Sequence, residues 1–430
     1  MQQQSHRANL WCIRGVCAAL LLLASVLLSG IAASAAPVCD VRAYGAKGDG
    51  TTKDTRAIQS AIDACAGTGG IVRLSSGTFL TGPLVLKSRI TLEVQAGATL
   101  LGSQDRHDYP PTEELREPAV QPLISASHAS HITLRGGGVI DGAGQPWWAD
   151  VYSHRHMPDF TPALRPRLIL FDHCSHIRIE NITAQNSPSW QIVLYYTSNV
   201  LIRNGKILAP ARSPNTDGID PFSAHHLRIE HMTIDVGDDN VAIKSGQPGS
   251  PGPDDPSTDI TIHDCTFLHG HGLSIGSEIA GGVQNVRAAH VTFTGTTNGV
   301  RIKSGRDRGG DIGHFQFSHL NMTNVVTPIV VTDYYGEARN APAQQPVTRL
   351  TPRMHDIRIE HLSATGARQA GLVAGLSESP ITGLTLKDVN IRAQRGMTVR
   401  YATIRAHRLQ ITADDGKPIT LLEAAQIQPK

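Results

Sequence analysis

Short runs in which apolar and polar residues alternate recur along most of the chain. In each run two strand-like pieces are separated by one or two turn residues, as in HIRIENITAQN from His176. An alternation with a period of two residues is typical of β-strands. The corresponding runs are HITLRGGGVIDG, NVLIRNGKILAP, HLRIEHMTIDVG, DITIHDCTFLHG, NVRAAHVTFTGT, HFQFSHLNMTNV and DIRIEHLSATGA, which begin at His131, Asn199, His226, Asp259, Asn285, His314 and Asp356. The pattern predicts one strand–turn–strand unit repeated many times.

The spacing of the units predicts the architecture. Successive units start at Ile177, Val200, Leu227, Ile260, Val286 and Phe315. These steps are clearly shorter than a propeller blade, which needs about 40 residues. We therefore predict an all-β fold: a single-stranded, right-handed parallel β-helix with one unit per coil. Inward Ile, Val and Leu side chains then stack in ladders, with equivalent residues about 4.8 Å apart.

Two segments depart from the alternation. DTRAIQSAIDACA, residues 54–66, has the spacing of an amphipathic helix with Asp54 or Thr55 as its cap. We expect this N-terminal capping helix to cover the open apolar end of the solenoid. GQPGSPGPDDPSTD, residues 246–259, is expected to be a loop that projects from one coil.

The first 36 residues have the composition of a secretory signal peptide. Arg7 and Arg14 precede the apolar run VCAALLLLASVLLSGIAA, which ends in the small residues ASAAP. We expect cleavage near Ala35 or Ala36, with an uncleaved membrane anchor as the less favoured alternative. Residues 37–430 are then one domain of a secreted or periplasmic protein that is not attached to a membrane.

The overall charge excludes one class of function. The chain has 39 Lys and Arg against 37 Asp and Glu, and removal of the two signal-peptide arginines leaves it close to neutral. Binding of nucleic acid through a generally basic surface is therefore not indicated. In an oxidising compartment Cys39 and Cys65 can pair, whereas Cys174 and Cys265 are expected to be buried thiols.

Carboxylates gather in SPNTDGIDPFSAHHLRIEHMTIDVGDDN, residues 213–240. Asp217 precedes the adjacent pair Asp238 and Asp239 by about the length of one coil. The solenoid therefore brings these three carboxylates together on neighbouring coils. Asp220 and Asp235 are expected to be structural.

Three further residues are predicted to join the same face. His271 follows Asp239 by about one coil, and Arg301 follows His271 by about one more. Lys303 points to the same side as Arg301 because side chains alternate along a strand. NTDG, GDDN, GHG and RIK then stack on consecutive coils and form a cleft that suits a polymer.

The cluster has the groups that hydrolysis of a glycosidic bond requires. Crowded carboxylates raise the pKa of at least one member, and one acid protonates the leaving oxygen while another group activates water. We hypothesise that Asp238 keeps its proton while Asp217 and Asp239 stay ionised. Arg301 and Lys303 would bind a substrate carboxylate, the arginine in a bidentate way.

Each motif alone has a simpler interpretation. NTDG and GDD are common in solvated turns, and RIK is ordinary at an exposed strand edge. His271 is compatible with a turn or, together with His263 and His269, with a metal cluster. The order and spacing of the four motifs favour a shared catalytic site.

NTDGID, GDDNVAIKSG, GHGLSIGSE and NGVRIKS, in this order, resemble the motifs of glycoside hydrolase family 28, the polygalacturonases. The resemblance extends from VRAYGAKGDGTTKDTRAIQSAIDAC through GGGVIDGAGQPWW and NSPSW to VVTDYYGE. It implies a pectin-lyase-like solenoid and an inverting hydrolase that cleaves α-1,4-linked galacturonic acid in pectin or polygalacturonate. It also implies that no metal and no other cofactor is needed.

The resemblance assigns catalytic roles to four residues. Asp238 matches the general acid of the family, and Asp217 and Asp239 match the pair that holds and activates the attacking water. His271 matches the histidine that tunes the acid through hydrogen bonding.

The resemblance assigns substrate binding to four further residues. Arg301 and Lys303 match residues that bind a galacturonate carboxylate, and Asn215 is the asparagine of the NTDG motif. Tyr335 aligns with the subsite tyrosine, with Tyr334 as the alternative. Asn240 stands where many fungal members have a cysteine, so the disulfide of those members is not expected.

Several alternatives remain open from the sequence. Endo and exo action are undecided, although a loop at residues 246–259 would favour cleavage from chain ends if it closed one end of the cleft. A rhamnogalacturonan or xylogalacturonan hydrolase is the nearest alternative. A calcium-dependent pectate lyase and a β-helix that binds polysaccharide without turnover are less favoured. In each case the expected partner is an acidic polysaccharide and the protein is expected to be a monomer.

Overall fold

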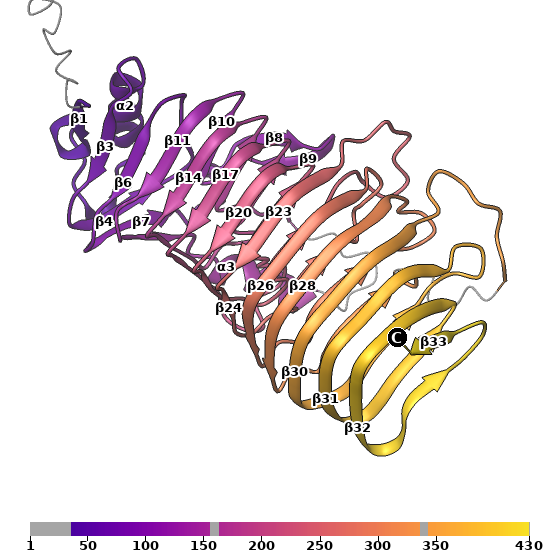
Figure 1. The fold of residues 1–430 in the computed structure, drawn as a ribbon. Coiled ribbons are helices and arrows are strands. Elements are labelled where there is room, and N and C mark those ends of the chain that lie inside the picture. Colours follow the sequence, from indigo (N-terminus) through magenta and orange to yellow (C-terminus); the bar gives the residue numbers. More distant parts are fainter. Residues whose placement is uncertain (1–35, 155–162, 336–342, 430) are drawn as a thin grey trace, which may run out of the picture. The chain divides into compact units, whose positions relative to one another are not determined.

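The computed structural model describes residues 36–154, 163–335 and 343–429 (Figure 1). The predicted signal peptide, apart from its last residue, lies outside the described residues. Residues 37–430 form one compact unit. In the part of the chain that is described, we find no helix with the length and apolar character needed to span a bilayer.

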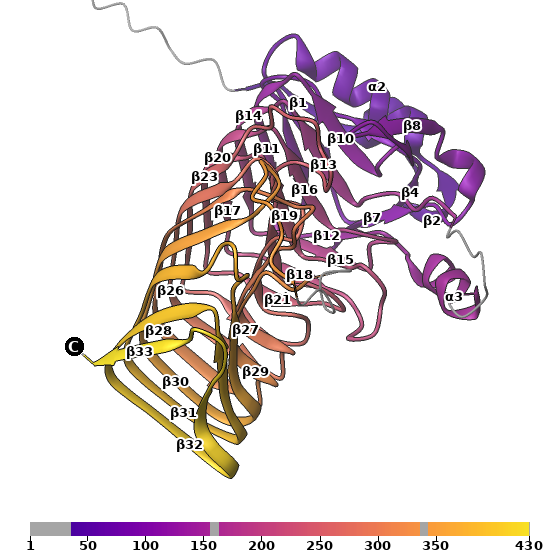
Figure 2. The same cartoon turned by 90° about the vertical axis from the view of Figure 1, so that its right-hand side faces the viewer.

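Residues 37–430 form a parallel β-helix, as predicted, with three rows of strands that pair in parallel from coil to coil (Figures 1 and 2). Row 1 contains β1 (Val38–Asp40), β3 (Ile71–Leu74), β6 (Thr91–Val94), β11 (Ser130–Arg135), β14 (Ser175–Glu180), β17 (Ser198–Arg203), β20 (His225–Glu230), β23 (Ser257–His263), β26 (Val283–Thr294), β28 (Asp311–Thr323), β30 (Arg353–Ala374), β31 (Ile381–Arg400), β32 (Ala402–Leu421) and β33 (Gln426–Pro429). The long strands among these also continue the other rows, because β26 pairs with β24 of row 2 and β30 pairs with β29 of row 3. Row 2 contains β2 (Asp49–Lys53), β4 (Gly77–Thr81), β7 (Ala98–Gly102), β12 (Val139–Asp141), β15 (Thr183–Gln185), β18 (Lys206–Leu208), β21 (Thr233–Asp235) and β24 (Thr266–Phe267). Row 3 contains β5 (Leu84–Val85), β10 (Ile124–Ser127), β13 (Ile169–Asp172), β16 (Ile192–Tyr195), β19 (Ile219–Phe222), β22 (Val241–Ile243), β25 (Leu273–Ile275), β27 (Asn298–Lys303) and β29 (Thr327–Thr332).

The predicted apolar ladders hold successive coils in register. In row 3 the backbone pairing aligns Ile124, Ile169, Ile192, Ile219, Val241, Leu273, Val300 and Ile329, and each is at most 1% exposed. The pairing in row 1 follows the repeat found in the sequence, from Ile177 through Val200 and Leu227 to Ile260. Burial of these side chains is the main driving force for stacking the coils.

The predicted capping helix is α2 (Thr55–Ala66), which packs against β1, β3, β5 and the 3-10 turn η1 (Val41–Tyr44) at the first coils. Ile58 and Ile62 on its inner face are fully buried. Asp54 occupies the N-cap position but its side chain does not cap the helix. Its carboxylate instead accepts hydrogen bonds from the backbone N–H groups of Lys47 (2.7 Å) and Gly48 (2.8 Å), so it secures the preceding loop.

Two additions to the coil were not predicted. Helix α3 (Gln145–His154) begins after a row 2 strand, and Trp147 on it is packed edge-on against Tyr109 with ring centroids 5.7 Å apart. An antiparallel hairpin, β8 (Pro111–Glu114) and β9 (Glu117–Val120), follows the 3-10 turn η2 (Arg106–Asp108). Neither segment has the alternating pattern of the coils, so the repeat gave no signal for them.

The cysteines behave as the sequence predicts. Cys39 and Cys65 form a disulfide that ties β1 to the capping helix. Cys174 and Cys265 are buried free thiols.

We expect the double variant Cys39→Ser, Cys65→Ser to be less stable than the wild type by about 3–4 kcal/mol, because the bond closes a long loop in the unfolded chain. Chemical denaturation with and without a reducing agent measures this difference. Reduction should shift the wild type and leave the double variant unchanged. A wild type that is insensitive to reduction would contradict the expected contribution.

Candidate active site

The backbone register brings three of the predicted residues into one column. Ile219, Val241 and Leu273 are paired across β19, β22 and β25, and each lies two positions after Asp217, Asp239 and His271, respectively. These three side chains therefore occupy the same position at the corner between rows 2 and 3 of consecutive coils. The predicted stacking is found in the structure.

Asp238 and His271 contact each other at this corner. His271 Nδ1 lies 2.9 Å from Asp238 Oδ1, and the same oxygen accepts the backbone N–H of Asp239 at 2.9 Å. His271 Nδ1 also lies 3.7 Å from Asp239 Oδ1. Two interactions thus converge on Oδ1 of Asp238, while its Oδ2 has no hydrogen-bond partner among the described residues.

The alternative metal cluster of His263, His269 and His271 is not formed by the described residues. His269 Nδ1 pairs with Asp235 Oδ1 at 2.8 Å, which agrees with a structural role for Asp235. His263 ends β23 in row 1 and groups with other residues.

Asp239 is buried in a positively charged environment. Its carboxylate accepts hydrogen bonds from Arg301 Nη2 (3.0 Å), Lys303 Nζ (2.9 Å) and Ser274 Oγ (2.8 Å). Burial of a 1% exposed carboxylate opposes ionisation, but Lys303 and Arg301 outweigh it and hold the pKa of Asp239 below its usual range. Asp239 is therefore an ionised carboxylate.

Arg301 and Lys303 lie at the predicted place, but their charges are already engaged by Asp239. The side chain of Arg301 is 15% exposed and that of Lys303 is 6% exposed. Arg301 Nε donates to Ser274 Oγ at 3.1 Å, and Nη1 has no hydrogen-bond partner among the described residues. For the bidentate contact with a substrate carboxylate that the sequence predicts, Arg301 Nη2 would have to leave Asp239. Nη1 can bind a ligand without this change.

Asp217 has a different environment from Asp239. It is 4% exposed, and burial, followed by the charges of Asp220 and Asp238, raises the pKa of Asp217 well above its usual value. This direction is opposite to the one that the hypothesis of an ionised Asp217 requires. The physical reason is that the two cations of the site contact Asp239 and not Asp217.

Asp220 belongs to this electrostatic cluster, whereas the sequence analysis placed it in a purely structural role. It lies on β19, is fully buried, and its two carboxyl oxygens have no hydrogen-bond partner among the described residues. Burial raises the pKa of Asp220 to about 8, against the opposing charge of Lys244. Lys244 Nζ is 3.7 Å from Asp220 Oδ1 and 3.1 Å from Glu278 Oε2.

Sequence reasoning missed Lys244 as a member of the site. It is only 4% exposed, and its Nζ lies 4.8 Å from the centre of the Trp190 ring. The alternation along VAIK was the available signal, because it places Lys244 on the same side as Ala242, which is aligned with Ser274 and Arg301.

Arg165 positions Asn215, the predicted substrate-binding asparagine. Arg165 Nη2 donates to Asn215 Oδ1 at 2.7 Å, and its Nη1 donates to the backbone oxygens of Pro188 (3.0 Å) and Pro214 (2.9 Å). Burial lowers the pKa of Arg165 to about 10, which leaves it a cation. Asn215 is thus fixed at the rim of the site by a residue that the motifs did not indicate.

Tyr335 lies beside Lys303, one of the two predicted cations, and beside Arg308, which was not predicted. Lys303 Nζ is 5.2 Å and Arg308 Cζ is 5.3 Å from the centre of its ring. Tyr334, the alternative, lies instead against Arg400, at 5.1 Å. The geometry therefore favours Tyr335 at the site.

A pocket of about 300 Å³ is linked to the site through Arg165, which contacts Asn215, and Trp190, which contacts Lys244; none of the clustered aspartates lines it. Its lining includes Glu114 and neighbouring residues of the β8–β9 hairpin, Arg165 and Arg167, Trp190, and Gln247 from the 246–259 loop. Arg167 Nε binds Glu114 Oε2 at 3.1 Å, and Arg167 Cζ lies 4.1 Å from the centre of the Trp190 ring. The hairpin and the loop thus bound this pocket together with an aromatic ring and two arginines.

We expect the free energy of unfolding to fall less steeply with rising pH in Asp220→Asn than in the wild type. The buried carboxyl binds its proton up to about pH 8, whereas its ordinary pKa is 3.8. The folded state therefore holds more protons than the unfolded state in this window, and the free energy of unfolding falls as pH rises, by up to about 1.4 kcal/mol per pH unit. Asparagine cannot titrate and removes this component.

Thermal unfolding between about pH 5 and 8 measures the effect, with Asp259→Asn at an exposed corner as the matched control. Parallel pH profiles for the wild type and Asp220→Asn would show that Asp220 does not bind the proton.

The chain is similar to known proteins over most of its length. Residues 68–407 match the model of the family described as glycosyl hydrolases family 28. A probable polygalacturonase of Vitis vinifera is 32% identical over 371 residues, which cover 81% of this chain and 73% of the relative. An endo-polygalacturonase of Pectobacterium carotovorum subsp. carotovorum is 30% identical over 376 residues, covering 84% and 89%.

A solved structure shares the fold. The hyperthermoactive exopolygalacturonase of Thermotoga maritima superimposes with a TM-score of 0.70 and 26% identity, over 91% of this chain and 92% of that chain. The family match extends over well more than half of the sequence and includes every residue of the carboxylate cluster. The chain belongs to glycosyl hydrolase family 28.

Proposed function

We propose that this protein is a secreted polygalacturonase that hydrolyses α-1,4 linkages between galacturonate units of pectin or polygalacturonate with inversion. The observation that carries the proposal is the corner column of Asp217, Asp239 and His271 with Asp238 beside it and Arg301 against Asp239. The names of the relatives add the substrate class.

Asp238 is the general acid of the proposed reaction. Its Oδ1 accepts the backbone N–H of Asp239 and faces His271 Nδ1. With Nδ1 of His271 as a donor, both contacts hold Oδ1, and Oδ2 carries the proton toward the leaving oxygen. This arrangement orients the acid and accounts for the role assigned to His271.

Asp239 is the proposed base because its charge is maintained by Arg301 and Lys303. Asp217, one coil away, holds the attacking water together with Asp239. Asp239 accepts the proton that this water releases as the new bond forms.

Arg301 and Lys303 also make the cluster unfavourable for a metal ion. Asp238, Asp239 and His271 have donor atoms close enough to hold one, but two cations already neutralise Asp239 within 3.0 Å. A divalent ion would meet their repulsion. The proposed mechanism therefore uses water, carboxylates and imidazole alone.

Secretion is part of the proposal and rests on the signal-peptide pattern. The Cys39–Cys65 disulfide agrees with folding in an oxidising compartment.

We expect Asp238→Asn to release reducing sugar from polygalacturonate about 10²–10⁴-fold more slowly than the wild type, because the leaving oxygen loses its proton donor. Asp235→Asn, which alters a nearby aspartate paired with His269, should keep its activity. Equal release by the wild type and Asp238→Asn would remove the assignment of the acid. Rhamnogalacturonan and xylogalacturonan serve as comparison substrates, and faster hydrolysis of either would favour the alternative specificity.

We further propose that the enzyme cleaves near chain ends. The pocket of about 300 Å³ that Arg165 and Trp190 line is bounded by the β8–β9 hairpin and by Gln247, and this size is at the lower limit of small-molecule sites. The arginines and Trp190 in its lining suit the carboxylate and the apolar face of one terminal sugar.

A time course of products tests this mode of action. The wild type should release monomer or dimer from the start, and a variant with residues 113–118 replaced by Asn-Gly should also release mid-length oligomers because the cleft is opened. Early mid-length oligomers from the wild type would exclude chain-end action without affecting the assignment as a polygalacturonase.

A further inference from the structure

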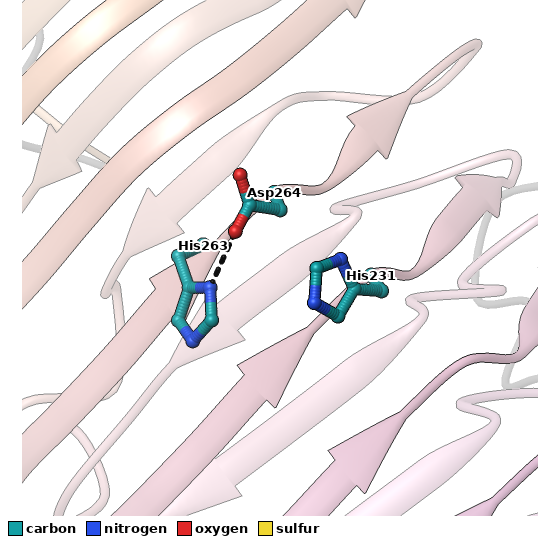
Figure 3. Close-up of side chains that lie close together, drawn as sticks. All are labelled: His231, His263 and Asp264. Carbon is teal, nitrogen blue, oxygen red and sulfur yellow. Dashed lines mark hydrogen bonds and ion pairs between the residues drawn. The ribbon is translucent and has the colours of Figure 1, made fainter.

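A second group of imidazole and carboxylate side chains lies at a different corner of the solenoid, between rows 1 and 2 (Figure 3). Glu230 ends β20 and His263 ends β23, and these two residues are paired in the parallel register. The next residues, His231 and Asp264, have φ values of 53° and 54°, a left-handed conformation that His and Asp adopt more readily than most residues. The two corners therefore present His231, His263 and Asp264 side by side.

Three potential ligand atoms converge in this group. One atom from each of His231, His263 and Asp264 lies within 4.8 Å of the other two. Figure 3 shows His263 Nδ1 directed at the Asp264 carboxylate, at 2.8 Å from Oδ2, with His231 on the adjacent coil. His231 and Asp264 are exposed and His263 is half-buried, so the group is accessible from solvent.

The other nitrogen of His263 is held by a buried carboxylate. Nε2 lies 3.0 Å from Oε2 of Glu230, whose side chain is 5% exposed. Arg228 Nε donates to the same oxygen at 3.0 Å, so this oxygen accepts hydrogen bonds and Nε2 carries the hydrogen. Nδ1 faces Asp264: it donates a hydrogen bond to that carboxylate when His263 is protonated, and it offers a lone pair to a metal ion when His263 is neutral. A histidine whose second nitrogen donates to a carboxylate is the usual arrangement of a metal-ligating imidazole.

Either a hydrogen on Nδ1 or a metal ion beside the two groups can join His263 to the Asp264 carboxylate, whose Oδ2 lies 2.8 Å from Nδ1. The described ion pairs of Asp264 include His263 but no Lys or Arg. Zinc binds nitrogen at about 2.0–2.1 Å and carboxylate oxygen at about 2.0–2.2 Å, which places tetrahedral donors roughly 3.3 Å apart. Rotation of the exposed His231 ring can shorten the remaining separation, and water completes the coordination.

A second group of two histidines and one aspartate, His314, His355 and Asp356, has a similar arrangement. His355 Nδ1 lies 3.0 Å from Asp356 Oδ2, and His355 Nε2 lies 2.9 Å from Asp311 Oδ1, which is bound by Arg353 Nε at 2.8 Å. His314 supplies the further imidazole. The carboxylate behind His355 is 43% exposed, against 5% for Glu230, so the His263 group is the better organised of the two.

We propose that His231, His263 and Asp264 form a binding site for a divalent transition-metal ion of the zinc type, with Glu230 as the residue that orients His263. Two imidazoles and one carboxylate select zinc, copper or nickel over calcium and magnesium. The ion would join the coil before the 246–259 loop to the coil after it. The step from Leu227 to Ile260 is the longest between Ile177 and Phe315, so a clamp there stabilises the coil that carries this loop.

The proposal is tested by calorimetric titration of the chelator-treated protein with zinc sulfate, together with thermal unfolding. Zinc should bind and raise the Tm of the wild type, as expected for an ion that binds the folded state, and magnesium should do neither. His263→Ala should remove one equivalent of bound zinc, and Glu230→Gln should weaken that equivalent by about 10–100-fold. Because the group lies at a different corner from the carboxylates, hydrolytic activity should be unchanged in both variants.

His176→Ala is the matched control. His176 is also a corner histidine of row 1, but it stacks on His131 with ring centroids 4.5 Å apart and bonds Ser175 Oγ, and it should retain the full zinc stoichiometry. If His263→Ala does not fold, Asp264→Asn replaces it, because Asn tolerates the positive φ of that corner. Equal zinc binding by the wild type and the His263 or Asp264 variant, or an equal loss in His176→Ala, would overturn the proposal.

Discussion

The parallel backbone pairing of each coil with the next is the constraint on which the rest of the structure depends. It aligns Ile219, Val241 and Leu273 in the core, and the residues two positions earlier are then forced into one column outside it. A slip of one residue would turn the buried side chains outward. The apolar ladder therefore sets the position of the carboxylates as firmly as their own contacts do.

The same register tolerates insertions because they leave the coil at its corners. The loop that follows β22 lengthens one step of the repeat, yet Leu227 still pairs with Ile260 in row 1. Such loops and the β8–β9 hairpin can shape the cleft without disturbing the column. In the proposed function, substrate selection and catalysis are therefore separated: the insertions shape the site that a polymer enters, and the ladder positions the carboxylate cluster.

Within the cluster, the pKa values of neighbouring aspartates shift in opposite directions, because the cations contact one and not the other. Arg301 and Lys303 contact Asp239 directly. For Asp217, burial and the charge of Asp220 raise the pKa more than the charge of Lys244 lowers it. Ionisation of one carboxylate therefore makes a proton on another more favourable. A site of this kind holds an acid and a base together at one pH.

The sequence predicted the parts of this molecule that follow from periodicity. The coil, the capping helix and the stacking of Asp217, Asp239 and His271 all follow from alternation and from steps of about one coil. Lys244, Arg165 and the proton balance between Asp217 and Asp239 did not follow, because they depend on side-chain reach between segments that no fixed spacing relates. The hairpin and α3 have no repeat signature, so the pocket beside the hairpin was accessible only from the structure.

The two imidazole–carboxylate groups show how the placement of arginine decides the chemistry of similar residues. At the catalytic corner Arg301 binds Asp239 itself, so the carboxylate is already neutralised and remains available to water rather than to a metal. At the row 1 corner Arg228 binds Glu230, behind His263, and Asp264 keeps its charge toward the imidazoles. In the carboxylate cluster the positive charge comes from Arg301, which contacts the carboxylate of Asp239 itself. In the other group Arg228 binds Glu230, which orients the proposed ligand His263, and the charge of Asp264 remains available to an ion from solution.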